Sequence, residues 1–245
     1  MLYYRELLTT DRDAYGIYVQ SPFPKENRRI LIGSDVSSRY TRRNRAEYRK
    51  IAGYIARCVW QRQGNYMVFF PSYRLMEDVL QVYEEEFSVD WVRCVCQTPD
   101  MTEQEREGFL EEFQEREGTL VGFCVLGGIF SEGVDLTGES LIGAVIVGTG
   151  LPQIGSQREI LKEYYDKKNH CGFDYAYRYP GMNKVLQAAG RVIRTKEDKG
   201  VILLLDDRFW DRDYQEIFPR EWQDRTGCRL DTVEGAVETF WKRFT

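Results

Sequence analysis

The sequence lacks the features of a membrane or exported protein. None of its apolar runs approaches the length needed to cross a bilayer, and its first residues do not follow the cationic-then-apolar order of a signal peptide. We therefore expect a cytoplasmic protein that makes no membrane contact. Histidine is also nearly absent, since His170 is the only one among 245 residues. We expect it to be a loop residue rather than a metal ligand or a catalytic base.

Cysteine is present but scattered. Of the six cysteines, only Cys94 and Cys96 stand close together in the sequence. Metal sites usually show more than one closely spaced pair of ligands. We therefore interpret the cysteines as buried thiols and expect no metal site in this chain.

Charge is abundant but segregated along the chain. The net charge is −5, yet residues 25–50 carry nine lysines and arginines against three acids, whereas residues 77–117 carry fourteen acids against three arginines. A basic stripe suits a nucleic-acid channel because it attracts phosphates. A solvated helix face is at least as good an interpretation for most of these side chains. The overall acidity predicts weak nucleic-acid affinity for the chain by itself.

Hydrophobic patterning predicts an α/β fold. With 42% hydrophobic and 14% aromatic residues, the chain can bury the core of one domain with decorations, or the cores of two. Helices are expected at 41–64, 72–87 and 102–117, and Ser72 and Thr102 are expected to cap the second and the third of them. Apolar runs without a polar alternate predict buried strands at 28–33, 65–71, 91–97, 118–126, 141–149 and 200–206. This alternation implies a doubly wound parallel sheet with helices on both faces.

A polar group follows the second predicted strand. Ser72, Tyr73 and Arg74 stand where that strand gives way to a helix, whose free N–H groups and positive end suit a nucleic-acid phosphate. Tyr73 fits base stacking, although packing against the next helix is the commoner fate of a tyrosine there.

The stretch Q-A-A-G-R-V-I-R at 187–194 carries the most information. On a helix, the spacings of four and three residues would place Gln187, Arg191 and Arg194 on one face. The small neighbours, Gly190 among them, would let a bulky anion approach closely. A phosphate-reading face is one interpretation, and a surface helix whose arginines pair with carboxylates is the other.

Three segments together resemble superfamily 2 helicases of the DinG/XPD-like family. Residues 187–194, followed by an acidic turn and a strand that ends in D-D-R-F, are similar to motif VI of that family. Residues 65–79 resemble motif IV and residues 127–152 resemble motif V, and all three occur in the family's order. The resemblance runs from about residue 20 to about residue 210. It implies a RecA-like three-layer α/β/α lobe with a mostly parallel sheet and helical decorations.

Two elements that a complete helicase needs do not occur in the sequence. There is no phosphate loop G-x-x-x-x-G-K-[ST], because the only adjacent glycines, Gly127 and Gly128, are not followed by Lys and Ser or Thr. There is also no acidic magnesium-binding motif. The resemblance therefore implies the second of two motor lobes, with 1–27 as a lead-in from the first lobe, 28–210 as the lobe and 211–245 as a helical tail. The first lobe would hold most of the ATP and magnesium, and an iron–sulfur cluster could lie upstream.

The resemblance also implies residue roles. Arg191 and Arg194 would reach the γ-phosphate of ATP as catalytic residues, and Gln187 would sense it through its amide. Nucleotide contacts would come from motif V and from the glycine of motif VI, that is, from Glu132, Gly133, Asp135 and Gly190. Ser131 would lie between the ATP cleft and the nucleic acid. The alternative is that Ser131 and Asp135 only cap turns and helix starts. The family resemblance favours function for Glu132 and Asp135 and leaves both interpretations of Ser131 open.

The segment 151–186 is rich in tyrosine and basic residues. Tyr179 belongs to five tyrosines interleaved with lysine and arginine, a composition that suits single-stranded nucleic acid. Helices packed on the rim of the lobe explain the composition equally well. The resemblance implies a partner, single-stranded DNA, along which the motor moves 5′ to 3′. The rival interpretation is a non-catalytic RecA-like scaffold, whereas a Rossmann-type enzyme is disfavoured because no glycine-rich turn follows the first predicted strand.

Overall fold

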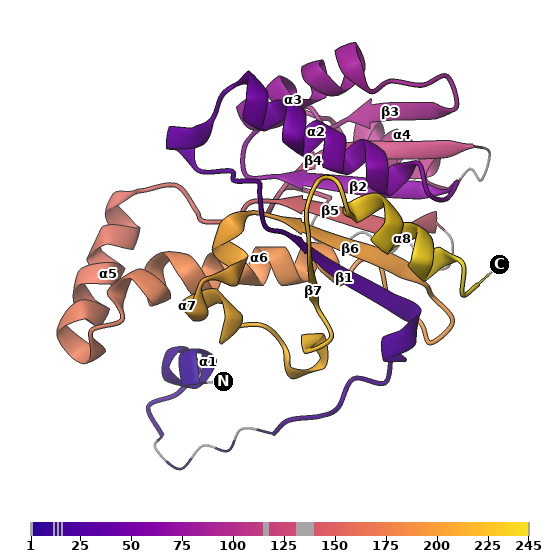
Figure 1. The fold of residues 1–245 in the computed structure, drawn as a ribbon. Coiled ribbons are helices and arrows are strands. Elements are labelled where there is room, and N and C mark those ends of the chain that lie inside the picture. Colours follow the sequence, from indigo (N-terminus) through magenta and orange to yellow (C-terminus); the bar gives the residue numbers. More distant parts are fainter. Residues whose placement is uncertain are drawn as a thin grey trace.

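The computed structural model describes residues 2–11, 13, 15, 17–114, 118–130 and 140–244. In this part of the chain, every strand belongs to one seven-stranded parallel sheet with the order β3-β4-β2-β5-β6-β1-β7 (Figure 1). The strands are β1 (Arg28–Gly33), β2 (Asn65–Phe70), β3 (Val92–Cys96), β4 (Thr119–Val125), β5 (Gly143–Val147), β6 (Gly200–Leu205) and β7 (Thr226–Cys228). The predicted α/β class and parallel sheet are confirmed, together with all six expected strands.

The helices alternate with the strands along the chain. They are α1 (Leu2–Leu8), α2 (Arg45–Val59), α3 (Tyr73–Glu86), α4 (Glu103–Glu112), α5 (Ser156–Asn169), α6 (Tyr179–Ala189), α7 (Arg212–Gln215) and α8 (Val233–Trp241). A short π-helical segment, η4 (Asp174–Arg178), runs directly into α6. Further single turns of 3₁₀-helix are η1 (Lys25–Asn27), η2 (Tyr40–Arg42), η5 (Asp207–Trp210) and η6 (Arg220–Trp222). No helix in these ranges is both long and apolar enough to cross a membrane.

Helix boundaries follow the caps that the sequence supplies. α2 begins at Arg45 rather than near residue 41 because the Asn44 side chain accepts from the Glu47 amide and so caps the helix there. The predicted caps of the next two helices are confirmed, since Ser72 accepts from the Leu75 amide and Thr102 forms a reciprocal capping box with Glu105.

The sheet is the middle of three layers. Alternate residues of a buried strand point to opposite faces, so Val68 of β2 packs with α2, α3 and α8, while Phe69 packs with α4 and α6. Both sides are sealed by large apolar side chains, which explains why the strands lack polar alternates. Figure 1 shows α5 extending away from this body, beyond the start of α6.

The C-terminal segment is more than a helical tail. The expected terminal helix is α8, but the segment also contributes β7, which pairs in parallel with β1 at the edge of the sheet. No sequence pattern predicted β7, because T-G-C has only three residues and no apolar run. β7 and α8 together make the segment part of the sheet and of one helical layer.

Two glycines allow the carboxyl end of β5 to meet the start of α6. Gly150 has a φ of 68°, and a Cβ built on it would lie 2.5 Å from the carbonyl oxygen of Gly181. A Cβ on Gly181 would in turn lie 2.7 Å from the carbonyl oxygen of Thr149. Only glycine fits at such a close approach, and the contact fixes where α6 begins.

Candidate functional site

The candidate residues fall on two opposite edges of the sheet. Because all strands are parallel, residues that follow strands gather at the carboxyl edge, and residues that precede them gather at the amino edge. Ser72 follows β2 and lies at the carboxyl edge. Arg191 and Arg194 lie between α6 and β6, and so approach the amino edge, where Gly200 pairs with Arg28.

The expected helical face of Gln187, Arg191 and Arg194 is not formed. α6 ends at Ala189, so Gln187 is helical and exposed, whereas both arginines lie in the turn beyond the helix. The turn tightens because the amides of Arg191 and Val192 donate to carbonyls only three residues back. The prediction that one helix face carries all three residues is therefore wrong.

A buried carboxylate holds this turn in place. The side chain of Asp198 is 5% exposed and accepts from the amides of Arg194 and Thr195, each at 2.7 Å, and from the Thr195 hydroxyl at 2.8 Å. Two of these three bonds fix the backbone on which the Arg194 side chain stands. A helix through residue 194 would have required those amides to donate to the preceding turn, so Asp198 is a physical reason for the break.

Apolar contacts anchor the same turn to the sheet. Val192 and Ile193 are buried between the two arginines and pack in the core on the α6 side. A Cβ on Gly200 would lie 2.2 Å from the Val192 side chain, so the first residue of β6 has room for the turn only as glycine. The buried pair faces the protein, while Arg194 is exposed.

At the carboxyl edge, the residues of motif IV are largely occupied with holding the fold. The side-chain oxygen of Ser72 accepts from the Leu75 amide and caps α3. Tyr73 is half-buried, and its hydroxyl accepts from Gln97 at 3.0 Å and donates to the carbonyl of Thr98 at 3.4 Å. Burial raises the pKa of Tyr73. Arg74 is exposed on the first turn of α3, where its charge faces solvent.

The motif V residues Ser131, Glu132, Gly133 and Asp135 lie outside the described residues, and their roles stay predictions. The described chain leads up to them through Phe130, whose buried ring stacks on Phe109 of α4 at a centroid distance of 4.2 Å. This contact fixes the chain just before the predicted nucleotide contacts.

The tyrosine-rich segment is mainly a packing element. Tyr165, Tyr175 and Tyr177 are buried, and only Tyr164 is largely exposed, at 57%. Tyr179 at the start of α6 packs against Tyr175 and also against Tyr3 of α1, at centroid distances of 5.4 and 4.7 Å. The interpretation as rim helices is favoured over an open ladder of stacking rings.

The charge segregation of the sequence is cancelled in three dimensions. Arg45 of α2 pairs with Glu85 at 2.7 Å and with Glu86 at 3.3 Å, and Arg49 also pairs with Glu86. The basic stretch thus lies against part of the acidic one across the α2–α3 contact. The interpretation of this part as a free basic stripe is not supported, because its charges are paired.

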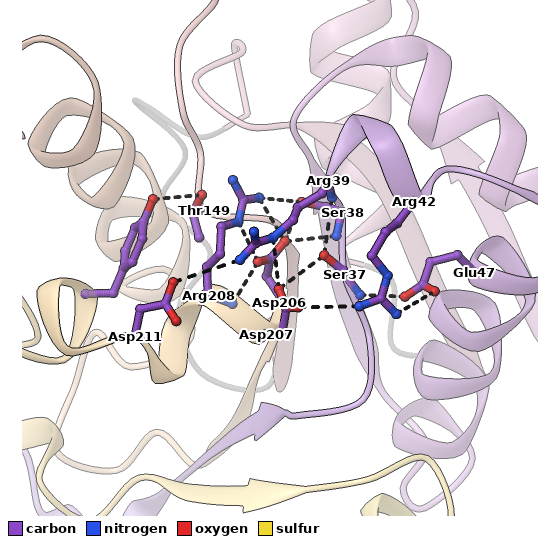
Figure 2. Close-up of polar contacts among 11 residues, drawn as sticks. Ser37, Ser38, Arg39, Arg42, Glu47, Thr149, Asp206, Asp207, Arg208 and Asp211 are labelled. Carbon is purple, nitrogen blue, oxygen red and sulfur yellow. Dashed lines mark hydrogen bonds and ion pairs between the residues drawn. The ribbon is translucent and has the colours of Figure 1, made fainter. Parts of the chain in front are cut away.

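A buried polar cluster that the sequence analysis missed joins the ends of β1 and β6 (Figure 2). Asp206 is fully buried and accepts from the amide and hydroxyl of Ser38, at 2.9 and 2.6 Å, and from Arg208 Nε at 2.7 Å and Nη2 at 2.9 Å. Burial works to raise the pKa of Asp206, but the hydrogen bonds and charge of Arg208, with those of Ser38, outweigh it and lower the pKa. The two chain segments are thereby locked together at the carboxyl edge.

A second, more exposed set of charges surrounds this cluster. Asp207 pairs with Arg39 and Arg42, each at 3.5 Å, and accepts from the Ser37 hydroxyl at 3.1 Å. The buried Glu47 accepts from the Ser37 amide at 2.6 Å and from Arg42 at 3.2 Å. Figure 2 shows these side chains converging from the loop after β1, from α2 and from the loop after β6. The D-D-R-F end of the motif VI segment was the only sequence signal for this cluster.

The cysteines behave as buried or half-buried thiols. Cys94 and Cys96 both lie on β3, and burial raises the pKa of each to about 11. Within the described residues, no group of three or more histidine, cysteine, aspartate or glutamate side chains could hold a metal ion.

Comparison with known proteins identifies relatives over most of this chain. A family model described as the helicase C-terminal domain matches residues 55–225. A probable ATP-dependent helicase of Methanocaldococcus jannaschii is 29% identical over 206 residues, which is 80% of this chain and 31% of that protein. The ATP-dependent DNA helicase XPD of Sulfolobus acidocaldarius is 30% identical over 189 residues, which is 73% of this chain and 31% of that protein.

A solved structure of an XPD helicase superposes with a TM-score of 0.64 at 24% identity, covering 82% of this chain and 35% of that one. At this identity the likeness shows the fold, which is that of a RecA-like lobe. The chain spans about a third of the length of the two relatives above.

Proposed function

Because the chain belongs to the helicase C-terminal domain family, we propose that it is the second motor lobe of an ATP-dependent DNA helicase. The observation that carries the proposal is the turn bearing Arg191 and Arg194, which Asp198 and the buried Val192 and Ile193 fix at the amino edge of the sheet. Guanidinium groups on a fixed backbone suit the recognition of phosphate, because little order has to be created when the anion arrives.

In this proposal ATP binds between a first lobe and this one. The first lobe supplies the phosphate loop and the magnesium ion, which neutralises phosphate charge during hydrolysis. Arg191 and Arg194 stabilise the negative charge of the transition state. In arginine fingers this contribution raises the rate of hydrolysis by roughly 10³-fold or more. Gln187 is exposed one turn before them and senses the γ-phosphate through its amide.

The remaining nucleotide contacts are proposed on the resemblance. They come from Glu132, Gly133 and Asp135 of motif V and from Gly190, which is exposed at the end of α6. An iron–sulfur cluster, where the complete protein has one, belongs to the first lobe. Since the phosphate loop and the magnesium motif occur nowhere in the sequence, the chain alone is expected to be inactive as an ATPase.

Single-stranded DNA is the proposed track, followed 5′ to 3′ with duplex unwinding. α3 begins at the carboxyl edge, and the exposed Arg74 adds a positive charge beside the N-terminus of this helix. Ser72, Arg74 and Ser131 are proposed as contacts to the DNA backbone. Tyr73 and Tyr179 stay predictions as base contacts, since both rings are packed against other aromatic or polar groups.

Each turnover would open and close the two lobes. Contacts from Arg191 and Arg194 to the γ-phosphate favour a closed state, and they vanish when the phosphate is cleaved and released. If the lobes hold DNA alternately, this cycle moves the protein along the strand.

The test is ATP hydrolysis by the intact parent protein, with and without single-stranded DNA, compared between wild type and Arg194→Ala. DNA-stimulated turnover that collapses in the variant is expected, while residues 1–245 alone stay inert. Turnover that is indifferent to both DNA and Arg194 would overturn the motor and leave a non-catalytic RecA-like scaffold as the better description.

A further inference from the structure

A cavity of about 540 Å³ lies beside α6, where α1, η4 and α7 meet this helix. Tyr3 and Tyr4 of α1, Asp174 and Arg178 of η4, and Asn183 of α6 belong to its walls, and the function proposed above uses none of these residues. η4 is a π-helical segment, a rare conformation that often marks a functional site. The volume lies within the range of about 300–1,000 Å³ that is usual for ligand pockets.

Two carboxylates in the cavity share one cation. The Arg178 guanidinium pairs with Asp174 through one terminal nitrogen and with Asp213 through the other, at 2.8 Å from Asp213. The same guanidinium lies over the rings of Phe173 and Tyr214, at 5.3 and 5.4 Å from their centroids, so contacts on several sides hold it in place. Among the residues that the structure describes, neither carboxylate pairs with a second cation. One of the two negative charges is therefore left without compensation.

The surroundings of Asp174 show the same imbalance. Burial raises the pKa of Asp174, the charge of Arg178 lowers it, and the charge of Asp213 raises it again, with burial as the largest of these effects. Glu216 adds a third carboxylate to the walls and pairs with Arg212 at 2.8 Å, where both side chains are exposed. Three carboxylates against two guanidiniums leave the cavity negative, so it attracts cations and repels phosphate groups.

Tyrosine rings and aliphatic side chains line the same cavity. The ring centroids of Tyr3 and Tyr4 lie 5.0 Å apart, and the Tyr4 hydroxyl donates to the Asn183 side chain at 2.6 Å. Leu186 and Ile217 add apolar surface. The face of an aromatic ring attracts a cation, and apolar surface stabilises the aliphatic stem that carries it. These walls therefore suit an organic cation.

Of the cations that a protein can meet, the guanidinium of arginine fits these walls best. A metal ion would need several ligands around it, and within the described ranges no three histidine, cysteine, aspartate or glutamate side chains come together in that way. A guanidinium is planar, so it can stack on a ring while its N–H groups pair with carboxylates, whereas the ammonium of lysine acts as a point charge.

We propose that this cavity binds an arginine side chain from a basic segment of a partner protein. The guanidinium of the partner pairs with the carboxylates of Asp174 and Asp213, and its aliphatic stem packs against Leu186 and Ile217. A protein is the expected source because the excess of carboxylates repels the phosphates of a nucleic acid. The site does not depend on the motor function, since the catalytic residues proposed for the motor lie outside its walls.

The experiment uses the chain of residues 1–245 without nucleotide, and follows the NMR signal of the Tyr4 ring, assigned by its loss in Tyr4→Leu. The probes are peptides of the form acetyl-Gly-Gly-X-Gly-Gly-amide, in which X is arginine, lysine or glutamine, titrated at equal ionic strength. A saturable shift with the arginine peptide is expected at a Kd of about 1 mM or below. The lysine peptide should bind more weakly, and the glutamine peptide should cause no shift.

Matched variants then locate the site. Asp213→Asn should lower the affinity for the arginine peptide by about tenfold or more, because it removes the charge of one carboxylate partner. The Asp213 side chain is 60% exposed, so this change should leave the fold intact. Asp174→Asn should act in the same direction. Asp231→Asn is the control and should leave the affinity unchanged, since Asp231 pairs with Arg229 and does not line the cavity.

The proposal is overturned if the arginine peptide causes no saturable shift, if either other peptide binds as tightly, or if Asp213→Asn binds as tightly as wild type. Should Asp174→Asn fail to fold, Asp213→Asn decides. A single-stranded oligonucleotide that saturates the Tyr4 signal would also overturn it and would favour Tyr179 as a base contact instead. Because the titration contains no ATP and measures no turnover, failure of the motor function would leave its result unchanged.

Discussion

The carboxylate of Asp198 fixes the backbone of Arg194. Its Oδ2 accepts from the Arg194 amide and from the neighbouring Thr195 amide, both at 2.7 Å, in a site that is nearly closed to water. The position of Arg194 therefore depends on a residue four places further along the chain. This relationship places Asp198 beside the proposed chemistry without any contact to the nucleotide.

Asp198→Ala should destabilise the chain and disorder this turn. Two amides lose their acceptor, and each stranded group costs roughly 1–3 kcal/mol when it stays buried. Asp198→Asn should lose much less, because its amide oxygen can accept from both. Urea denaturation measures the stability, and hydrogen exchange at Arg194 and Thr195 reports the turn itself. Amides that stay protected in Asp198→Ala would contradict the assignment.

In the parent protein, Asp198→Ala should lower the rate of ATP hydrolysis in the same direction as Arg194→Ala. The effect is expected on kcat more than on KM, because the first lobe holds most of the nucleotide. Asp198→Asn should recover most of the rate. A full rate in Asp198→Ala, together with a collapse in Arg194→Ala, would show that the arginine does not need this anchor.

The buried pair of Asp206 and Arg208 predicts a large stability effect. Asp206→Ala would leave the Arg208 guanidinium poorly compensated at the junction of β1 and β6, and breaking such a pair costs about 3–5 kcal/mol. The double variant Asp206→Leu/Arg208→Met should lose less than the single variant, because it leaves no unpaired charge. Urea denaturation of wild type, the single variant and the double variant forms the test, and a double variant that loses as much stability as Asp206→Ala, or more, would argue against a coupled pair.

The lowered pKa of Asp206 predicts that part of the chain's stability is lost in acid. Its pKa is lower in the folded chain than in the unfolded one, so its ionised form stabilises the fold at pH values above its unfolded pKa of about 3.9. That contribution is lost as the pH falls through the folded-state pKa. The stability gap between wild type and Asp206→Asn should therefore be constant near neutrality and shrink below about pH 4. A gap that widens in acid would reverse the sign of the assignment.

Variants of two exposed arginines, Arg74 and Arg45, can distinguish a specific nucleic-acid contact from a general effect of positive surface charge. Arg74 lies at the start of α3 at the carboxyl edge, whereas Arg45 is tied to Glu85 and Glu86 across the α2–α3 contact. Arg74→Glu should weaken binding of single-stranded DNA by the parent protein and flatten its dependence on salt. Arg45→Glu, with the same charge change, should have a smaller effect. Equal effects would indicate a diffuse electrostatic response without a site.

Continuous apolar runs made the strands readable from the sequence. β2 and β6 are buried on both faces, and a strand with two covered faces has no polar alternate, so the pattern was unambiguous. The capping residues Ser72 and Thr102 were readable for a similar reason, because their partners lie within three residues. Local physics was sufficient for both.

The site depended on contacts that local patterns do not contain. The helix does not continue to Arg194, because Asp198 accepts from the Arg194 amide and Gly200 makes room for Val192. Both residues lie beyond the stretch 187–194 from which the helix was predicted. Asp206 meets Ser38 across 168 positions of sequence, a separation over which spacing carries no information. Arg28, which begins β1, gave no such signal, since the burial of its unpartnered Nε appears only once the chain is folded.

Gly150 and Gly235 provide a matched test of the backbone at the carboxyl edge. Gly150→Ala places a Cβ 2.5 Å from the Gly181 carbonyl at a φ of 68°, so it should destabilise the chain by more than about 1 kcal/mol. Gly235 lies on the exposed side of α8, and a Cβ there meets nothing within 4 Å. Gly235→Ala should therefore stabilise the chain by roughly 0.5–1 kcal/mol through helix propensity. Thermal and urea unfolding of both variants decide the point, because a neutral Gly150→Ala would mean that the start of α6 can shift away from β5.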